Sequence, residues 1–368
     1  MTEKEYKKKI LQVIAPLLKQ KDITLTELAQ KAQGATPIDL YKIVGERASY
    51  TKNARKYSGQ SFSYPEPNPV DFDWRFTEET SKKIANKINR VSSSIGCFGT
   101  PSIFGHLIGK SDIKLFDINP FLQDDFPLFK DNIRLIDLDN EILDGYCFDT
   151  IIMDPPWYLD SYSNWFIQAI NNLKQGGKIF TTIIPPLVRS NAIPEWEKLI
   201  FKFDGILINE NLELDVEYET PFFEHETFDS LGLGYVGNWR KTQLISYKLV
   251  SKPRLNISKK QNGNWKRFRF GNKIVSLNIT SDDSKIRVKS PYLDGSYTLK
   301  SVSNRDEIRK SVNFITSRNK CLIINGTEKV EIFLQRLSLN HDFNKSIDSS
   351  YTHEEIESLK IIHSIIGL

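Results

Sequence analysis

The chain has 368 residues, of which 39% are apolar and 26% are charged, and its formal net charge is +4. This composition is ordinary for a globular protein, and the length predicts two or three domains. No segment approaches the roughly 18 consecutive apolar residues of a membrane span. The first ten residues, MTEKEYKKKI, also lack the apolar region of a signal peptide. We therefore expect a cytoplasmic protein without membrane association.

Metal binding is not expected from the sequence. The three cysteines, Cys97, Cys147 and Cys321, have neither CxxC spacing nor the pattern of a disulfide framework. The five histidines are scattered, without the spacing of metal ligands. We therefore expect neither a structural zinc nor a catalytic metal.

Residues 1–60 are predicted to form a small helical domain, because apolar residues recur there at helical spacing. Thr24 or Thr26 is a suitable N-cap for a helix through ELAQKA. Gly34 and Pro37 then separate this helix from another short one. Three short helices of this kind indicate a helix-turn-helix or winged-helix module, or equally a plain helical docking domain.

A segment rich in Ser, Pro, Asn and Gly follows at residues 49–73 and is predicted to be a linker. Beyond it, short apolar runs alternate with helical segments. The predicted strands lie at residues 94–99, 113–118, 132–138, 147–154 and 178–184, and the predicted helices include residues 77–88 and 164–177. Such alternation indicates a parallel sheet covered on both faces. We therefore predict a doubly wound α/β domain over residues 61–250.

Several predicted strands end in residues suited to binding a nucleoside, and ligands of doubly wound sheets bind at the carboxyl ends of the strands. The first strand leads into GCFGTPS, where Gly99 and Thr100 allow a ligand close to the backbone. The second ends in Asp117, whose carboxylate could accept hydrogen bonds from both hydroxyls of a ribose. The third leads to Asp137, a candidate partner for an adenine amino group, with Asp139 as its competitor.

The fourth predicted strand ends in Asp154-Pro155-Pro156-Trp157. Proline fixes φ and has no N–H, so this backbone is rigid and short of donors while its carbonyls can still accept. Asp154 and the Pro155 carbonyl could accept both N–H bonds of an amino group on a flat ring, and Trp157 could stack on that ring. Held in this way, the amine would direct its lone pair at a methyl donor. Asp154 or water would then take the proton.

These motifs together resemble class I S-adenosylmethionine-dependent methyltransferases that modify amino groups. More narrowly, DWRFTEET, CFGTPSIFGHL, LFDINPFL and DTIIMDPPW resemble the N6-adenine-methyltransferase-like family over about residues 71–190. The resemblance implies S-adenosylmethionine as the cofactor and the N6 amine of adenine in DNA or RNA as the acceptor. It implies a cofactor site made by Trp74, Phe76, Gly99, Thr100, Asp117, Asp137 and Asp154. Asp154, Pro155, Pro156 and Trp157 would form the acceptor site.

The charge distribution leaves the acceptor open. Residues 251–300 hold twelve Lys or Arg against three Asp, and NWKRFRF interleaves cations with aromatic residues. This pattern fits single-stranded nucleic acid, although an ordinary β-hairpin would also produce it. Residues 204–230 hold nine acids and no Lys or Arg, which instead fits a cationic acceptor. Nucleic acid is therefore the expected partner, while a protein lysine and a polyamine that receives an aminopropyl group are the alternative acceptors.

A different class of function is a catalytically inactive methyltransferase fold that serves as a scaffold subunit, and a protein partner is a further possibility. The region 251–368 is predicted to be a basic α+β accessory domain. In it, Ser303 and Asp306 resemble a capping box, and YTHEEIESLKIIHSIIGL is predicted to be a closing helix. Both features favour a structural role over a chemical one.

Overall fold

The computed structural model describes residues 2–20, 23–32, 34–45, 65–90, 92–109, 112–210, 214–260, 263–280 and 285–368. The chain divides into two compact units. Unit 1 contains Met1–Ser63, Trp74–Thr220 and Leu233–Lys260, and unit 2 contains Tyr64–Asp73, Pro221–Gly232 and Gln261–Leu368. Most of the predicted linker at residues 49–73 lies outside the described residues. The division into three functional domains therefore stays a prediction.

Unit 1 begins with α1 (Glu3–Ile14), the short 3-10 helix η1 (Leu17–Lys19), α2 (Leu25–Lys31) and α3 (Pro37–Val44). Thr24 is the N-cap of α2: its hydroxyl accepts the Glu27 N–H, and the Glu27 carboxylate accepts the Thr24 N–H. The hydroxyl of Thr26, the other predicted cap, instead accepts the N–H of Gly237 at 2.9 Å. The identity of these helices as a winged-helix module stays a prediction.

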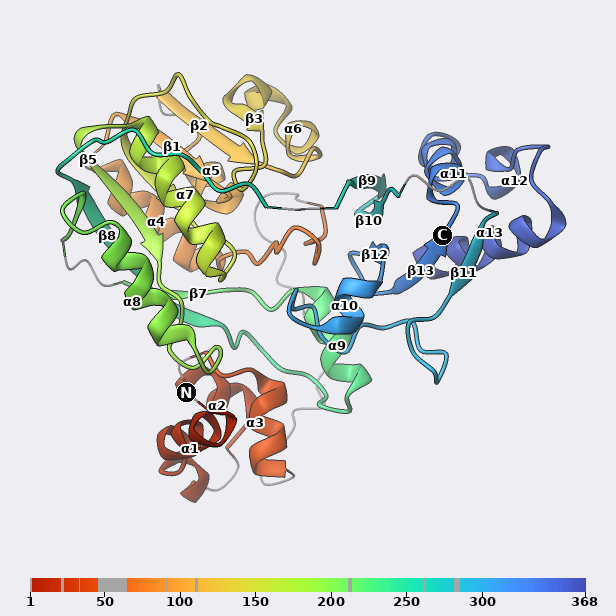
Figure 1. The fold of residues 1–368 in the computed structure, drawn as a ribbon, viewed down its shortest axis with the longest axis horizontal. Helices are drawn as coiled ribbons and strands as arrows, with labels where there is room; N and C mark the ends of the chain where they lie inside the picture. The colour runs from red at the N-terminus through yellow and green to blue at the C-terminus, as the bar shows by residue number, and fades with distance from the viewer. Residues whose placement is uncertain are drawn as a thin grey trace. The chain divides into compact units, whose positions relative to one another are not determined.

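An eight-stranded sheet forms the centre of unit 1, in the order β3-β2-β1-β4-β5-β8-β6 with β7 beside β8 (Figure 1). Its strands are β1 (Ser94–Phe98), β2 (Asp112–Asp117), β3 (Ile133–Leu135), β4 (Phe148–Met153), β5 (Leu173–Thr182), β6 (Leu207–Asn209), β7 (Leu214–Glu217) and β8 (Lys241–Leu249). β1 to β5 are parallel, and β8 is antiparallel to its neighbours. β2 and β3 thus lie on one side of β1, and β4 and β5 lie on the other. This strand order confirms the doubly wound fold.

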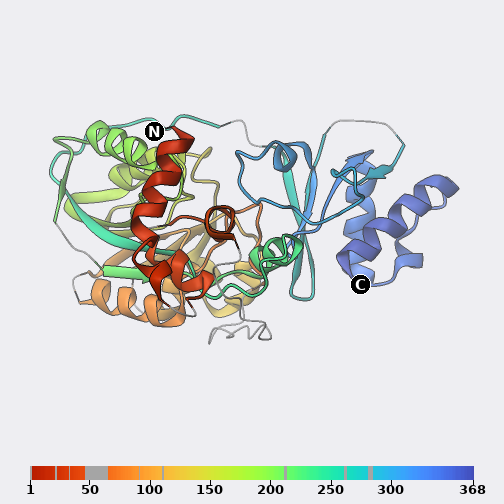
Figure 2. The same cartoon turned by 90° about the horizontal axis from the view of Figure 1, so that it is seen from below.

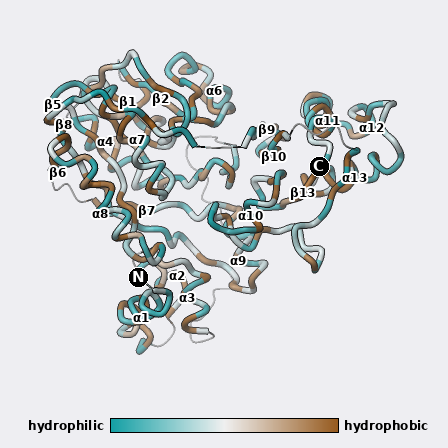
Figure 3. Tube along the Cα trace, in the orientation of Figure 1, coloured by the Kyte–Doolittle hydropathy of each residue, from teal (hydrophilic) through white to brown (hydrophobic). Residues whose placement is uncertain are grey.

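Helices cover both faces of this sheet. α4 (Glu78–Asn89) and α5 (Pro101–Leu107) lie on one face, whereas α7 (Leu159–Asn172) and α8 (Ala192–Lys202) lie on the other (Figure 1, Figure 2). Apolar and hydrophilic residues alternate along these helices, as one-sided burial requires (Figure 3). The short helices α6 (Leu122–Asp125) and η3 (Pro127–Asn132) connect β2 to β3. None of the described helices is long and apolar enough to cross a membrane.

One predicted boundary in this domain is wrong. The helix expected at residues 164–177 ends at Asn172, and β5 begins at Leu173, which pairs with Phe148 of β4. Gly176 has a φ of 78°, which a right-handed helix does not allow. The glycine pair at 176 and 177 therefore belongs to an extended, bent strand.

Unit 2 contains a second sheet, with five strands in the order β11-β13-β12-β10-β9. The strands are β9 (Trp265–Phe270), β10 (Lys273–Asn278), β11 (Arg287–Lys289), β12 (Phe314–Thr316) and β13 (Cys321–Asn325). Its helices are α9 (Phe222–Ser230), α10 (Glu307–Ser311), α11 (Thr327–Asn340), α12 (Phe343–Ser346) and α13 (His353–Ile366). The predicted closing helix is α13. Asp306 caps α10 by accepting the N–H of Arg309, so of the predicted pair Asp306 and not Ser303 is the cap.

The NWKRFRF segment is a β-hairpin strand packed into unit 2. β9 pairs with β10, and Phe268 and Phe270, two residues apart on one face, are buried in the hydrophobic core. Arg267 forms a buried ion pair with Asp71, and Lys266 pairs with Glu331 at 2.5 Å. These two phenylalanines cannot stack on bases while they are in the core. The hairpin interpretation is correct, base stacking by Phe268 and Phe270 is excluded, and binding of nucleic acid by this segment stays a prediction.

Candidate active site

The register of the central strands brings three predicted site residues together. Phe98, the last residue of β1, lies between Phe116 of β2 and Met153 of β4. The next residue after each of these three is a predicted site residue: Gly99 after β1, Asp117 at the end of β2 and Asp154 after β4. The Gly99 N–H donates to the Phe116 carbonyl at 2.8 Å, and the Asp154 N–H donates to the Phe98 carbonyl at 3.3 Å. The glycine turn and the two carboxylates therefore lie abreast at the carboxyl edge of the sheet.

Packing explains the glycine of the first turn. Gly99 has a φ of 59°, and a Cβ at this position would lie 2.5 Å from the Trp165 ring of α7. The side of Gly99 that was expected to admit a ligand is therefore filled by an indole. Thr100 is buried, and its hydroxyl oxygen has no hydrogen-bond partner within the described residues. An orphaned hydroxyl beside this turn fits a polar ligand group, but contact of Gly99 and Thr100 with the cofactor stays a prediction.

Asp117 ends β2 at the predicted place. Its carboxylate accepts the N–H of Asn119 at 2.8 Å, and the residue is partly exposed. The Asn119 side chain then accepts the N–H of Phe121 at 3.0 Å. Two successive side-chain turns thus fix the loop after β2 and hold the carboxylate at the sheet edge. This geometry suits the predicted ribose contact.

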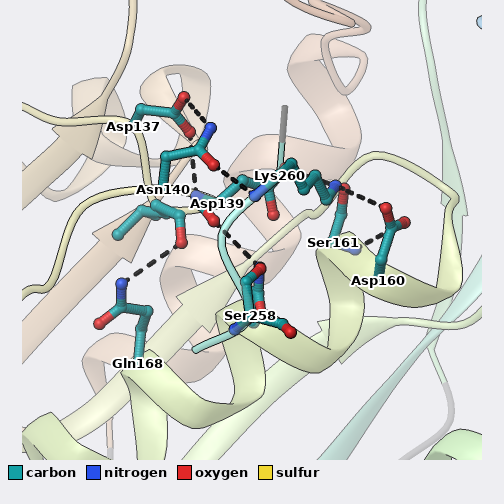
Figure 4. A network of polar contacts seen from close by, with 10 residues as sticks. Asp137, Asp139, Asn140, Asp160, Ser161, Gln168, Ser258 and Lys260 are labelled. Atoms are coloured by element: carbon teal, nitrogen blue, oxygen red, sulfur yellow. Dashed lines mark hydrogen bonds and ion pairs between the residues drawn. The ribbon is translucent and has the colours of Figure 1, made fainter. Parts of the chain in front are cut away.

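Asp137 and Asp139 lie in the loop that follows β3 (Figure 4). The Asp137 carboxylate accepts the Asp139 N–H at 2.9 Å and the Asn140 side-chain amide at 2.7 Å. Asp139 is paired with Lys260 at 2.8 Å and accepts the Ser161 hydroxyl at 3.0 Å. Burial raises the pKa of Asp139, and Lys260 opposes that rise. Asp139 therefore holds Lys260, the last residue of unit 1, by an ion pair. Of the two acids, Asp137 remains the predicted adenine contact.

Asp154 is the most strongly perturbed carboxylate of the sheet edge. Since Met153 pairs with Thr181, Thr182 lies beside Asp154, and its hydroxyl donates to Oδ1 at 2.7 Å. The Tyr218 hydroxyl donates to the same oxygen, also at 2.7 Å. Among the described residues no donor reaches Oδ2 or the Pro155 carbonyl. Burial raises the pKa of Asp154 to about 7, although both hydroxyls and the charge of Arg240 lower it.

Aromatic side chains pack around Tyr218, one of the two donors to this carboxylate. The Trp157 ring lies edge-on to Tyr218, with centroids 5.7 Å apart. The Tyr218 ring also packs on Phe76 at 4.7 Å, and Phe76 is fully buried. Trp74 lies with its ring 4.4 Å from the Arg240 guanidinium carbon. Phe76 thus supports Tyr218 from the core, and a direct contact of Trp74 or Phe76 with the cofactor stays a prediction.

Thr182, Tyr218 and Arg240 were not predicted from the sequence. Thr182 could have been found, because it ends β5 just as Asp154 directly follows β4. Tyr218 and Arg240 follow β7 and precede β8, at the edge where the sheet is antiparallel. Their approach to Asp154 depends on a strand pairing that apolar periodicity does not reveal.

Residues 73–217 match the sequence model of a family described as "Probable N6-adenine methyltransferase". A branched-chain polyamine synthase from Thermus thermophilus has a similar structure, with 11% identity and a TM-score of 0.53 over 70% of this chain and 90% of that one. TrmN from Thermus thermophilus has 10% identity and a TM-score of 0.34, over 49% of this chain and 51% of that one. No curated protein matches the chain.

The N-methyltransferase NodS from Bradyrhizobium japonicum has 12% identity and a TM-score of 0.31, over 46% of this chain and 87% of that one. The family match confirms the resemblance found in the sequence and the S-adenosylmethionine cofactor that it implies. The likeness to the synthase confirms the Rossmann-like class I fold.

Proposed function

We propose that this protein, an S-adenosylmethionine-dependent methyltransferase by its family match over residues 73–217, methylates the exocyclic N6 amine of adenine in DNA or RNA. One observation carries the proposal. Asp154 follows a parallel strand with Oδ1 held by two hydroxyls and Oδ2 without a donor from the described residues, and one of those hydroxyls belongs to Tyr218, whose ring contacts the indole of Trp157. A carboxylate oxygen and a carbonyl beside an aromatic ring suit an amine on a planar ring.

The residues of the chain would act on the acceptor amine. S-adenosylmethionine, when bound, supplies an electrophilic methyl group. Asp154 Oδ2 and the Pro155 carbonyl would accept the two N–H bonds of the amine and draw its lone pair out of conjugation with the ring. Thr182 and Tyr218 hold the carboxylate so that it need not reorganise during the reaction. The methylated nitrogen is acidic, and Asp154 or water would take its proton.

The site should work best above neutral pH. With a pKa of about 7, Asp154 is half ionised near neutral pH and mostly ionised above it. An ionised carboxylate is the stronger acceptor and the better proton acceptor. We expect the rate of transfer to rise as pH increases through about 7, as far as this group controls it.

A cationic acceptor draws little support from the acidic stretch. Glu210 pairs with Lys178 at 2.8 Å, and Glu217 pairs with Lys241 at 3.0 Å. Burial raises the pKa of Glu219 to about 7, so this group is partly neutral at physiological pH. Glu213 lies outside the described residues, and Asp215 is exposed. Two of the nine acids counted in the sequence are therefore ion-paired and a third is partly neutral, which reduces the negative charge available to attract an amine.

The experiment incubates the full-length protein with S-adenosylmethionine labelled in its methyl group and with DNA, RNA, lysine-rich protein and polyamine pools. Label is expected in DNA or RNA. Asp154→Ala should lower that transfer by about 10²–10³, as expected for removing one preorganised polar group. The Asp154→Ala variant should bind S-adenosylmethionine with an affinity within a few fold of the wild-type value. Asp144→Ala, which removes an exposed carboxylate of the same unit, is the matched control and should not change the rate.

Each other result would identify a different function. Label in protein would point to lysine methylation. Aminopropyl transfer from the decarboxylated cofactor to polyamine would point to a synthase. Failure of calorimetry to detect any S-adenosylmethionine binding would favour the inactive scaffold. An Asp154→Ala variant as active as the wild type would remove Asp154 from the acceptor site.

A further inference from the structure

Arg240 lies within a cluster of three indoles at the acceptor site. Its guanidinium carbon is 4.4 Å from the ring centroid of Trp74, 5.2 Å from that of Trp157 and 4.5 Å from that of Trp239. We call these four residues the tryptophan–arginine cluster. Each distance is within the range of a cation–π interaction, and several such contacts fix a planar cation more firmly than one does. One member, Trp157, belongs to the predicted acceptor motif.

The backbone around Arg240 is held from two directions. The Arg240 carbonyl accepts the N–H of Tyr218 at 3.1 Å, and Trp239 is fully buried. The loop just before the cluster is bound by α2, because the Gln30 side-chain amide donates to the Asn238 carbonyl at 2.6 Å. The Gly237 N–H donates to the Thr26 hydroxyl of the same helix. The guanidinium is therefore placed by the sheet edge and by the N-terminal helices of the same unit.

The charge of Arg240 acts on the acceptor carboxylate. Its positive charge favours ionised Asp154, and among the described residues Tyr162 and Tyr218 also interact with this carboxylate. Arg189, the cation that acts on Tyr162, is ion-paired with Glu195. An ammonium ion that donated to Asp154 Oδ2 would enter the field of the guanidinium. A neutral amine would not feel that repulsion, and a phosphate group attached to it would be attracted.

We propose that Arg240 is a specificity-determining residue that makes the Asp154 site select a neutral amine on a planar base carried by a polyanion and reject a protonated aliphatic amine. This inference rests on the proposed methyl transfer at Asp154 and specifies its substrate class. Protein lysines and polyamines are protonated at neutral pH, whereas the amino group of adenine is neutral. Guanidinium planes also stack on bases, so Arg240 could contact the base as well as repel the cation.

The test compares the full-length wild type with Arg240→Gln and Arg240→Lys. Transfer of labelled methyl groups is measured to an oligoadenylate in RNA and DNA form, to a lysine peptide and to spermidine. For two charges several ångströms apart near a protein surface, removal of one changes the preference for a neutral over a cationic acceptor by about ten- to a hundredfold. Arg240→Gln should therefore lower the ratio of oligoadenylate to amine transfer by that factor, and Arg240→Lys should largely preserve it. Arg254→Gln, which removes an exposed arginine beside the far end of α7, is the control.

Two further readouts separate specificity from a merely structural role. Spermidine binding, followed by the fluorescence of the clustered tryptophans, should become tighter in Arg240→Gln without any need for turnover. The midpoint of the acid limb of the pH–rate profile should move to higher pH in Arg240→Gln and stay in place in Arg240→Lys. Cofactor affinity, measured by calorimetry, should change less than threefold in both variants.

An unchanged ratio of oligoadenylate to amine transfer in a folded Arg240→Gln variant would overturn the inference. So would a loss of more than tenfold in cofactor affinity, because the guanidinium would then belong to the cofactor site. Failure of the proposed function is recognised separately, from the wild type alone: it would label amines and leave both oligoadenylates unlabelled.

Discussion

The tryptophan–arginine cluster and the β9 hairpin have similar sequences, GNWRK and NWKRFRF, but place their aromatic and basic side chains in different surroundings. In the cluster, Arg240 lies among aromatic rings and its charge acts on a carboxylate that keeps one oxygen without a donor from the described residues. In the hairpin, the phenylalanines enter the core of unit 2 and Arg267 is neutralised by Asp71. Aromatic and basic residues next to each other in sequence therefore do not by themselves indicate binding.

Strand geometry produces this difference. Successive side chains of a strand point to opposite faces, so residues 268 and 270 must share one face, and in β9 that face is the core. Arg240, in contrast, immediately precedes β8, where the side chain can turn toward the carboxyl edge of the parallel strands. Arg267 is thus fixed in an ion pair within its unit, whereas the functional role of Arg240 is a proposal.

Arg267→Ala should have the largest effect on stability, because it leaves the Asp71 carboxylate buried without its partner. Only 11% of the Arg267 side chain and 5% of the Asp71 side chain are exposed. Loss of one partner of a buried ion pair costs about 3–5 kcal/mol of unfolding free energy. Urea denaturation measures this loss, with Arg287→Ala on exposed β11 as the control. A loss below about 1 kcal/mol would show that the hairpin arginine is not structural.

The fold of unit 1 was more predictable than the details of its site. Apolar runs and the strand-end rule placed Asp117 and Asp154 correctly at the sheet edge, because parallel strands share one direction. The packing of Trp165 on Gly99 and the convergence of Tyr218 on Asp154 join residues about 65 positions apart, and apolar periodicity carries no signal for such contacts. The charge count of residues 204–230 does not reveal local pairing either, since Glu210 and Glu217 are ion-paired with lysines of the same unit.

Asp154→Asn should stabilise the protein at alkaline pH, because the site holds this carboxylate at a cost to stability. The pKa of Asp154 rises from 3.8 to about 7 on folding, so the folded state binds the proton more tightly than the unfolded state does. The resulting penalty is absent below pH 4, grows between pH 4 and 7, and is complete above 7. At pH 8 the variant should gain on the order of 2–4 kcal/mol of unfolding free energy.

At pH 4 the same substitution should change the unfolding free energy little, because the carboxyl group of the folded wild type is then already neutral. Thermal and urea unfolding at both pH values measure the difference, and Asp144→Asn at an exposed position is the control. An Asp154→Asn variant that is equally destabilised at pH 4 and pH 8 would contradict the raised pKa.

Asp117→Ala should have the smallest free-energy effect of the three, and on cofactor binding alone. Two ribose hydroxyls would lose a charged acceptor, which weakens affinity by roughly 1.5–3 kcal/mol. Calorimetric titration with S-adenosylmethionine measures the loss, and circular dichroism verifies the fold. Asp124→Ala, at an exposed position of α6 in the same connection, is the control. Unchanged affinity in a folded Asp117→Ala variant would place the ribose elsewhere.

The most direct test of the account is the chemical position of the transferred methyl group. Oligonucleotides of RNA and DNA that contain adenine are treated with the wild type or Asp154→Ala, digested to nucleosides and analysed by mass spectrometry against synthetic standards. We expect N6-methylated adenine nucleoside from the wild type and at least a hundredfold less from the variant. A methyl group found only on another base, on lysine or on a polyamine would contradict it.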